Sequence, residues 1–545
     1  MTQHADGPAG RREQPRGEQG PDGTSSPDWV HRAIIYGVDV LRFADSNGDG
    51  NGDLRGLVGK LDYLAELGVD CLWLLPFFPS ERRDNGYDIT NQLGVDSRIG
   101  SLDDFRLLAE EAHARGIRLL VDLVLHHTSD RHPWFQAAES DAGSRFRGYY
   151  LWSAKEPPDS EEKSAFPQEE HDGIWSWSER ARAFYRHKFY DFEPDLRLAS
   201  DEVWEQVKVI VDFWIAMGAD AFRLDAAGEF FVDPGVPNSK ADLVERLDDL
   251  RGYLRERAPA VALLGEVDLK PEGLPPYIDR GRLDQLLAFL PNNALYLALA
   301  TEDAQPLLAA VASNQETVQR GSWRQFLRNL DELNLSHLSE EQRATVFRVF
   351  ADHEQERIYG RGIRRGWAPM MGTPERQRMT MSLLFALPGA PLLVAGQEIG
   401  MGDDLRLEGR ATVRLPMQWS AEDGGGFSTS RDGIAATLLT DGPYGHQHVN
   451  VAAQQDDDGS LLALVRSLIR LWREHPDIAS PHTEAIKADT SVVAFRYGDI
   501  LAAHNLAAGA RPLPDAAIGG EPLLGEAGED GRTLPAHGFL WVRTP

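Results

Sequence analysis

Four carboxylates lie at or just after the ends of apolar runs, where an acid needs a partner or a chemical task. Asp122 lies in LLVDLVL, Asp225 ends AFRLD, Glu266 follows ALLG, and Asp331 follows FLRNL. Burying a carboxylate costs free energy unless it is paired or hydrogen-bonded. A single such acid could cap a helix or pair with an arginine, but four in corresponding places indicate a shared site.

Two of these acids differ in their surroundings. Arg223 lies two residues before Asp225, so on a strand both side chains share one face, and we expect the guanidinium to keep Asp225 ionised. Glu266 follows an apolar run, which favours a protonated general acid. Retaining glycosidases need one ionised and one protonated carboxyl group, about 5 Å apart. Asp331 would hold sugar hydroxyls and favour the oxocarbenium-like ring.

The elements that must position these acids follow from a repeated alternation. AIIYGVDV (33–40), VDCLWLLP (69–76) and IRLLVDLVL (117–125) read as buried strands, and 57–68 and 102–116 read as amphipathic helices that end at glycine. Such alternation, without a nucleotide-binding glycine loop, predicts an α/β fold, a (β/α)8 TIM barrel. Reactive groups of such barrels lie at the carboxyl ends of the strands.

Two segments depart from the alternation. The stretch after the third strand is rich in aromatic residues, Ser, Glu and Pro and has no clear period, which predicts an inserted lid subdomain. The last stretch has short β-rich runs between turn residues, which predict a C-terminal antiparallel β domain. The expected domains are a disordered tail (1–28), the barrel (29–127 and 200–478), the inserted subdomain B (128–199) and the β domain (479–545).

The charge and composition of the chain limit the kinds of binding partner that we expect. The chain has 545 residues and a formal net charge of -29, which repels phosphate backbones and anionic lipid. We therefore expect no nucleic-acid or membrane partner, but a neutral small molecule. The single cysteine, Cys71, and the lack of a signal-like or membrane-spanning apolar run predict a cytoplasmic protein. The oligomeric state stays open, a homo-oligomer included.

Residues 45–53 read DSNGDGNGD, with an oxygen-bearing side chain at every second position. Alternating oxygen ligands are typical of loops that bind Ca²⁺. A signalling EF-hand is disfavoured, because Gly56 takes the place of the bidentate Glu and a strand precedes the loop. A metal clip that stabilises the structure is favoured over an Asx-rich loop without metal.

Five motifs resemble, in order and spacing, the signature regions of the α-amylase superfamily, glycoside hydrolase family 13. They are GYD (86–88), DLVLHH (122–127), FRLDAA (222–227), GEV (265–267) and RNLDE (328–332). Within the superfamily, DSNGDGNGDLRGL, HTSDRHPWF, IYGRGIRR and VRLPMQWS are similar to the trehalose synthase group. The resemblance covers about residues 30 to 500 and becomes thin in the β domain.

The resemblance implies a role for each matching residue. Asp225 would be the nucleophile, Glu266 the acid/base and Asp331 the transition-state stabiliser. Substrate would be bound by Tyr87, Asp88 and His127, with Arg223 orienting the nucleophile and Arg414 pairing with substrate or with the acids of the pocket. A structural Ca²⁺, with Mg²⁺ as the alternative, would be held by Asp45, Asn47, Asp49, the backbone of Asn51, and Asp53. No organic cofactor is implied.

The implied activity is that of a retaining enzyme on a small α-glucoside such as maltose or trehalose, which it interconverts by intramolecular glucosyl transfer. A hydrolytic α-glucosidase, of the oligo-1,6-glucosidase or sucrose-active type, is the alternative. A catalytically weak carbohydrate-binding relative on a retained barrel is the second alternative.

Four positions depart from the usual pattern of these enzymes. His126 stands where Asn is usual, which puts a second calcium site in doubt, and Leu330 replaces a His that would bond a sugar hydroxyl. Ala395 and Gln397 stand where Tyr and Asp are usual. With the three carboxylates kept, these changes predict an active enzyme with altered specificity.

Overall fold

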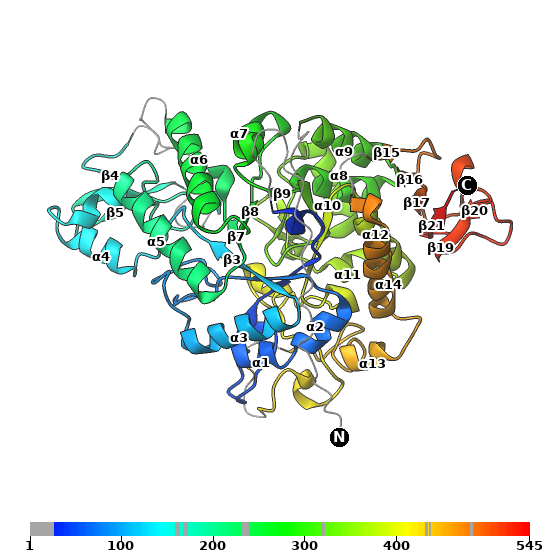
Figure 1. The fold of residues 1–545 in the computed structure, drawn as a ribbon, viewed down its shortest axis with the longest axis horizontal. Helices are drawn as coiled ribbons and strands as arrows, with labels where there is room; N and C mark the ends of the chain where they lie inside the picture. The colour runs from blue at the N-terminus through cyan, green and yellow to red at the C-terminus, as the bar shows by residue number, and fades with distance from the viewer. Residues whose placement is uncertain are drawn as a thin grey trace, which may run out of the picture.

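Eight short parallel strands form a closed barrel at the centre of the molecule (Figure 1). The structure is a computed structural model that describes residues 27–157, 164–166, 173–229, 239–317, 322–430, 434, 438–479 and 483–544. In spatial order the barrel strands are β1 (Ile35–Val38), β14 (Ala390–Val394), β10 (Ser322–Phe326), β9 (Gln285–Leu287), β8 (Ala262–Gly265), β7 (Ala221–Leu224), β3 (Arg118–Leu123) and β2 (Cys71–Leu74). The predicted TIM barrel is confirmed.

Helices surround the barrel and alternate with its strands in the chain. The longer ones are α2 (Leu61–Leu67), α3 (Leu102–Ala114), α5 (Asp201–Met217), α6 (Ser239–Arg257), α8 (Phe289–Thr301), α9 (Gln305–Thr317), α10 (Glu340–Phe350), α12 (Pro374–Ala386) and α14 (Leu461–Glu474). The remaining ones are α1 (Leu54–Val58), α4 (Pro133–Ser140), α7 (Pro275–Ile278), α11 (Trp367–Met371) and α13 (Val451–Gln455). Ser101 starts α3 with a capping box, and Gly68 ends α2 in the left-handed conformation at φ 96°.

The barrel interior is apolar at its centre. Cys71, Leu120 and Leu264 are buried there in one cluster with Trp73 and Leu330. Burial raises the pKa of the Cys71 thiol well above its usual value, which agrees with a core residue rather than a nucleophile. A second, larger cluster fills the layer between the barrel strands and the surrounding helices.

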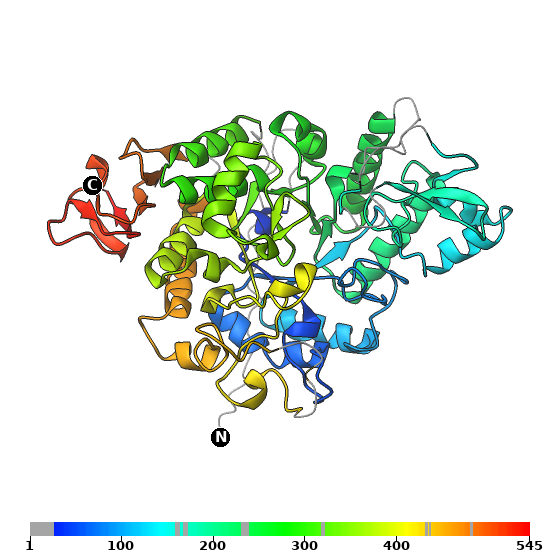
Figure 2. The ribbon, with the colours of Figure 1, turned by 180° about the vertical axis from the view of Figure 1, so that it is seen from behind.

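The insertion predicted after the third barrel strand lies between β3 and α5. Its described part contains α4 and a three-stranded antiparallel sheet in the order β4 (Trp152–Ser153), β6 (Ala183–Arg186), β5 (Trp175–Ser178). This part projects from one side of the barrel, and the C-terminal domain lies at the opposite side (Figures 1 and 2). Residues 158–163 and 167–172 of the insertion, and residues 1–26 of the predicted tail, lie outside the described residues. The domain boundaries stay predictions.

The C-terminal domain is built on an antiparallel five-stranded sheet, as predicted. Its order is β15 (Glu484–Ala485), β16 (Val492–Tyr497), β17 (Ile500–Asn505), β21 (Phe539–Arg543), β19 (Glu521–Gly525), and β18 (Arg511–Pro512) pairs with β20 (Thr533–Leu534). Ser382 of α12 bonds His504 (2.9 Å) and accepts the Trp541 indole N–H (2.8 Å), so the sheet is fixed to the barrel by a buried polar contact. Within the described residues, the helices are all too short or too polar to cross a membrane.

Candidate active site

A cavity of about 160 Å³ lies at the carboxyl ends of the barrel strands. Asp225, Glu266 and Asp331, the three predicted catalytic residues, all line it. Asp225 directly follows β7 and Glu266 directly follows β8, and Asp331 lies in the loop after β10. The chain therefore brings together three acids from widely separated segments by placing each at the same end of the barrel.

Arg223 on β7 contacts three carboxylates at once. Its Nη1 donates to Asp225 Oδ1 at 2.8 Å and also bonds Asp122, and its Nη2 lies 2.8 Å from Glu266 Oε2. The indole of Trp73 on β2 packs 4.8 Å from the guanidinium and donates to Asp122 Oδ2 at 3.0 Å. A single buried cation thus compensates a group of buried anions, which is the condition for keeping them inside a protein.

Glycine at position 37 makes this arrangement fit. A Cβ at Gly37 on β1 would lie 2.9 Å from Cε3 of Trp73. The indole therefore rests directly against the backbone of β1, in space that another residue would fill.

Burial sets the protonation of the acid pair. Burial raises the pKa of Glu266 to about 7, against the opposing charge of Arg223, as predicted for a general acid. Arg223 lowers the pKa of Asp225 as expected, but burial outweighs the guanidinium and raises this pKa above its usual value, to about 6, so Asp225 is still mostly ionised at neutral pH. The pKa of Asp225 is still lower than that of Glu266, so near neutral pH Asp225 is the more ionised of the two.

The backbone after Asp225 supports the same pair. Ala226 has φ 46°, a left-handed conformation that is strained for a residue other than glycine. Its N–H donates to Glu266 Oε2 at 2.9 Å. The strained residue therefore links the segment that carries the predicted nucleophile to the predicted acid.

Asp331 is kept ionised, because two arginines lower its pKa. Arg414 Nη2 lies 2.6 Å and Arg410 Nη1 2.9 Å from its Oδ1. Burial alone would raise the pKa of Asp331, but the two guanidinium groups hold it well below its usual range. Arg414 lies beside Asp331 without lining the catalytic cavity. It therefore pairs with an acid of the pocket, one of its two predicted partners.

The predicted sugar-binding residues divide into two groups. Tyr87 and His127 line the cavity. Asp88 does not line it, because its fully buried carboxylate accepts hydrogen bonds from Ser80 Oγ at 2.6 Å and from the backbone N–H of Asp84 at 3.2 Å. Asp84, four residues earlier, lines the cavity and pairs with Arg410.

The His127 ring lines the catalytic cavity. Its two ring nitrogens are buried and have no hydrogen-bond partner among the described residues, and Nε2 lies 3.7 Å from Glu193 Oε1. Burial lowers the pKa of His127, so the ring is neutral near pH 7 and has one donor and one acceptor. Its neighbour His126 faces Asp195 at 3.3 Å instead.

Several cavity residues were missed by sequence reasoning. They include Asp84, Phe166, Asp268, Glu332 and Arg410. Three of them had a signal: Asp84 opens DNGYD, directly before a motif that was recognised, Glu332 ends the recognised motif RNLDE, and Arg410 lies four residues before Arg414. The others lie in loops and in the insertion, where no periodicity marks which side chains point inward.

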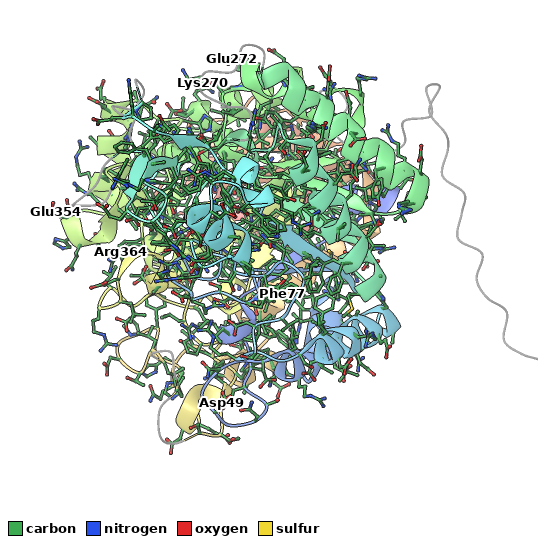
Figure 3. All side chains as sticks on the ribbon, turned by 90° about the vertical axis from the view of Figure 1, so that its left-hand side faces the viewer. Asp49, Phe77, Lys270, Glu272, Glu354 and Arg364 are labelled. Carbon is green, nitrogen blue, oxygen red and sulfur yellow. The ribbon has the colours of Figure 1, made fainter. Side chains whose placement is uncertain are left out.

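Subdomain B and the segment 354–365 meet above the cavity. The Phe166 and Tyr359 rings stack at 4.8 Å, the hydroxyls of Tyr190 and Tyr359 are 2.8 Å apart, and Arg361 Nη2 donates to the Ala165 carbonyl at 2.9 Å. We call these three interactions the roof contacts. Glu354 and Arg364, at the two ends of this segment, mark its position on the side shown in Figure 3.

Leu330 lies apart from the cavity. Its side chain is buried in the barrel core beside Phe326 and Val394, and it does not line the catalytic cavity. The expectation that Leu330 changes the sugar pocket directly is therefore not met in this structure, since Asn329 and Asp331 line the cavity on either side of it.

The oxygen-rich loop lies at an edge of the molecule, as Asp49 in Figure 3 shows. Asp45 Oδ1 accepts hydrogen bonds from the backbone N–H groups of Asn47 (3.0 Å) and Gly48 (2.7 Å). Its Oδ2 accepts hydrogen bonds from the backbone N–H of Gly50 (2.8 Å) and the hydroxyl of Ser428 (2.6 Å). Burial opposes ionisation, but these hydrogen bonds hold the pKa of Asp45 below its usual value.

The donor set fits a hard cation in kind. Asp45, Asn47 and Asp49 supply carboxylate and amide oxygens from one tight loop, which is the donor type that a hard cation prefers. Both oxygens of Asp45 already accept two hydrogen bonds each, so a bound cation would have to replace some of these donors. Asn47 and Asp49 also bond each other, through Asn47 Nδ2 and Asp49 Oδ2 at 3.2 Å. Asp53 is partly committed elsewhere, because Oδ1 accepts the Gly56 N–H at 2.7 Å and caps α1. The ligand role of each residue, the backbone of Asn51 included, stays a prediction.

Comparison with known proteins agrees with this geometry. Residues 38–480 match the family model "Alpha amylase, catalytic domain". The chain is 34% identical to the trehalose synthase/amylase TreS of Mycobacterium tuberculosis, over 95% of this chain and 91% of that protein. It is 33% identical to the trehalose synthase of Pimelobacter sp., over 95% and 96% of the two chains.

Solved structures show the same fold. The alpha-amylase from H. orenii is 27% identical with a TM-score of 0.76, covering 94% of this chain and all (100%) of that one. The trehalulose synthase MutB from Pseudomonas mesoacidophila MX-45 is 22% identical with a TM-score of 0.77, covering 96% and 100%. The chain belongs to the alpha-amylase family, glycoside hydrolase family 13, and is an enzyme of its glycosidase and transglucosidase type.

Proposed function

We propose that this enzyme interconverts maltose and trehalose by retaining, intramolecular glucosyl transfer. The observation that carries the proposal is the acid pair Asp225 and Glu266, held by one guanidinium in a cavity that the roof contacts cross. The sequence relatives named trehalose synthase support the same substrate class.

In the first step Asp225 attacks the anomeric carbon of the bound glucosyl unit. Glu266 donates its proton to the glycosidic oxygen, so the carbon–oxygen bond breaks, glucose leaves and a glucosyl ester forms on Asp225. Negative charge passes from Asp225 to Glu266 in this step. Arg223 contacts both groups, so it stays beside an anion throughout.

In the second step the released glucose turns and its anomeric hydroxyl attacks the ester. Glu266, now ionised, takes the hydroxyl proton, and Asp225 is regenerated as a carboxylate. Asp331, ionised between Arg410 and Arg414, supplies the negative charge that favours the oxocarbenium-like ring at both barriers.

The roof contacts favour isomerisation over hydrolysis. An enclosed glucose reattacks before water does, whereas an open cavity exchanges glucose for water and gives an α-glucosidase. Hydrolysis is the second candidate, because the name of the mycobacterial relative joins trehalose synthase with amylase. A binding-only role is disfavoured because all three carboxylates line one cavity.

We further propose that the loop of residues 45–53 holds a structural Ca²⁺, or Mg²⁺, and that the enzyme acts in the cytoplasm. The oxygen-bearing side chains at alternate positions of this loop support the metal. The single buried Cys71, which can form no internal disulfide, supports a reducing compartment.

Product analysis tests the activity. The enzyme is incubated separately with maltose, trehalose, isomaltose and sucrose, and the sugars are separated and measured over time. We expect trehalose from maltose, maltose from trehalose, and glucose as a minor product. Glucose as the sole product from maltose would reject isomerisation and establish the α-glucosidase alternative.

A further inference from the structure

A second cavity, of about 50 Å³, lies next to the catalytic one. Asn329 lines both cavities, whereas Arg414 and Leu330 line the second one alone. Arg414 therefore stands between the two spaces: its Nη2 holds Asp331 of the catalytic cavity, and its side chain forms a wall of the second.

Four buried N–H groups of residues that line this cavity have no hydrogen-bond partner among the described residues. They are Nε and Nη1 of Arg42, Nη1 of Arg414 and the indole Nε1 of Trp367. The Arg414 side chain is 2% exposed, and its other nitrogens are engaged, with Nε donating to the Leu330 carbonyl at 2.8 Å. Buried donors left without acceptors destabilise a fold, so a missing acceptor is indicated.

The residues that line the second cavity carry more positive than negative charge. Arg42, Arg328 and Arg414 line it, and Asp39 is the carboxylate among its lining residues. Within the described part of the chain, neither Arg42 nor Arg328 has a carboxylate oxygen within ion-pair distance. The nearest negative charges are shared between arginines: Asp39, which stabilises the charged form of Arg42, also lies 3.8 Å from Arg82, and Asp331 is shared by Arg410 and Arg414.

The size of the space selects the occupant. Small residues form part of its wall, with Ala395, Gly396 and Gly402 on the loop after β14. A water molecule needs roughly 10–15 Å³ of such volume, so the cavity has room for one small ion with a few waters and is too small for a sugar ring. A neutral water would satisfy donors but would leave the guanidinium charges uncompensated.

We propose that this cavity binds a small monovalent inorganic anion, such as chloride, between Arg42 and Arg414. The Trp367 indole supplies a further donor. The anion separates two guanidinium groups that otherwise repel each other, and it fixes Arg414 in the position from which it holds Asp331. The site is distinct from the sugar cavity, and its occupancy does not depend on the proposed reaction.

A crystal of the full chain grown in sodium bromide tests the site directly. Anomalous scattering at the bromine absorption edge is expected to show one strong peak in the second cavity, within hydrogen-bond distance of Arg42 and Arg414. Density that refines as water alone, with no anomalous signal, would overturn the proposal.

A thermal titration tests the same site in solution. Sodium chloride replaces sodium methanesulfonate, whose anion is too large for the cavity, at constant ionic strength. We expect the Tm to rise saturably by about 2–4 °C in the parent protein, because a ligand that binds the folded state stabilises it. A Tm that does not respond to chloride would contradict the proposal.

Matched variants assign the effect to this cavity. Arg42→Gln should lose both the bromide peak and the chloride response. Arg466→Gln is the control, because Arg466 on α14 also has an unpaired buried Nε but lies outside both cavities. Ala395→Tyr fills the space and keeps every arginine, so it gives an independent answer if Arg42→Gln does not fold. A chloride response of equal size in Arg42→Gln, or in a folded Ala395→Tyr variant, would show that the anion binds elsewhere.

Discussion

At the scale of single residues, Arg223 decides how the acids of this site share charge. Asp122, Asp225 and Glu266 all contact the one guanidinium. The sequence predicted that Arg223 and Asp225 share a face, since they are two residues apart on a strand. It could not predict the protonation of Asp225, because that depends on how completely the barrel buries the carboxylate and on the neighbouring acids brought by other strands.

The pH dependence of the reaction follows from these carboxyl groups. Asp225, with a pKa of about 6, must be ionised, so activity rises as pH increases through that value. Glu266, with a pKa of about 7, must be protonated, so activity falls as pH increases further. We expect a bell-shaped profile of kcat/KM with its maximum between the two values. A profile that is flat from pH 5 to 9 would contradict these assignments.

Replacing Arg223 shifts that profile. Arg223 lowers the pKa of both acids, so Arg223→Ala should move both limbs to higher pH and reduce kcat by roughly 10²–10³, the loss typical of an electrostatic catalytic contact. Arg257→Ala, at an exposed ion pair with Asp212, is the control for removing one positive charge. Circular dichroism separates the catalytic effect from unfolding. If a folded Arg223→Ala variant gave the same pH profile of kcat/KM as the parent, Arg223 would not set these protonation states.

At the scale of secondary-structure elements, regular segments were predictable and irregular ones were not. Strands and helices repeat with their own periods, so the alternation and the carboxyl-end placement of Asp225 and Glu266 could be predicted. The loop that carries Asp84 and Asp88 has no period, and the family resemblance selected Asp88, whereas Asp84 lines the cavity. The contact of Phe166 with Tyr359 joins two distant loops, and such contacts leave no local sequence pattern.

Weakening the roof contacts should increase hydrolysis. Tyr359→Phe removes the bond to the Tyr190 hydroxyl but keeps the ring stacked on Phe166, whereas Tyr359→Ala removes both. We expect the ratio of glucose to trehalose formed from maltose to rise from the parent through Tyr359→Phe to Tyr359→Ala, severalfold in total. The measurement is product analysis at equal conversion. An unchanged ratio in the folded Tyr359→Ala variant would mean that these contacts do not retain glucose.

The loop metal should act on stability rather than on chemistry. Chelation should lower the Tm more than it lowers activity measured well below melting, because the loop lies at an edge of the molecule (Figure 3) and none of residues 45–53 lines the catalytic cavity. Asp49→Ala should reproduce the shift, since Asp49 is exposed and its side chain bonds only neighbours in the loop. Asp103→Ala, at an exposed carboxylate on α3, is the control. An apoprotein that melts at the temperature of the metal-loaded form would refute the site.

At the scale of the whole molecule, the insertion and the barrel build the site together, because Ala165 and Phe166 of the insertion line the same cavity as the three carboxylates of the barrel. The sequence predicted the barrel, the insertion after the third strand and the C-terminal sheet, because each differs in period and composition. It also located the three carboxylates, through their positions and through the family resemblance. It could not show whether subdomain B closes over the cavity, since that depends on the packing of Ala165, Phe166 and Tyr190 against a distant segment.

Isotope exchange tests the central claim, that glucose is transferred without leaving the site. Maltose is converted in the presence of excess ¹³C-labelled free glucose, and the trehalose formed is analysed by mass spectrometry. An enclosed cavity predicts trehalose that is almost entirely unlabelled, because the released glucose reattacks before it can exchange. Trehalose that carries the label in proportion to the free glucose pool, or glucose formed with no trehalose, would contradict the account.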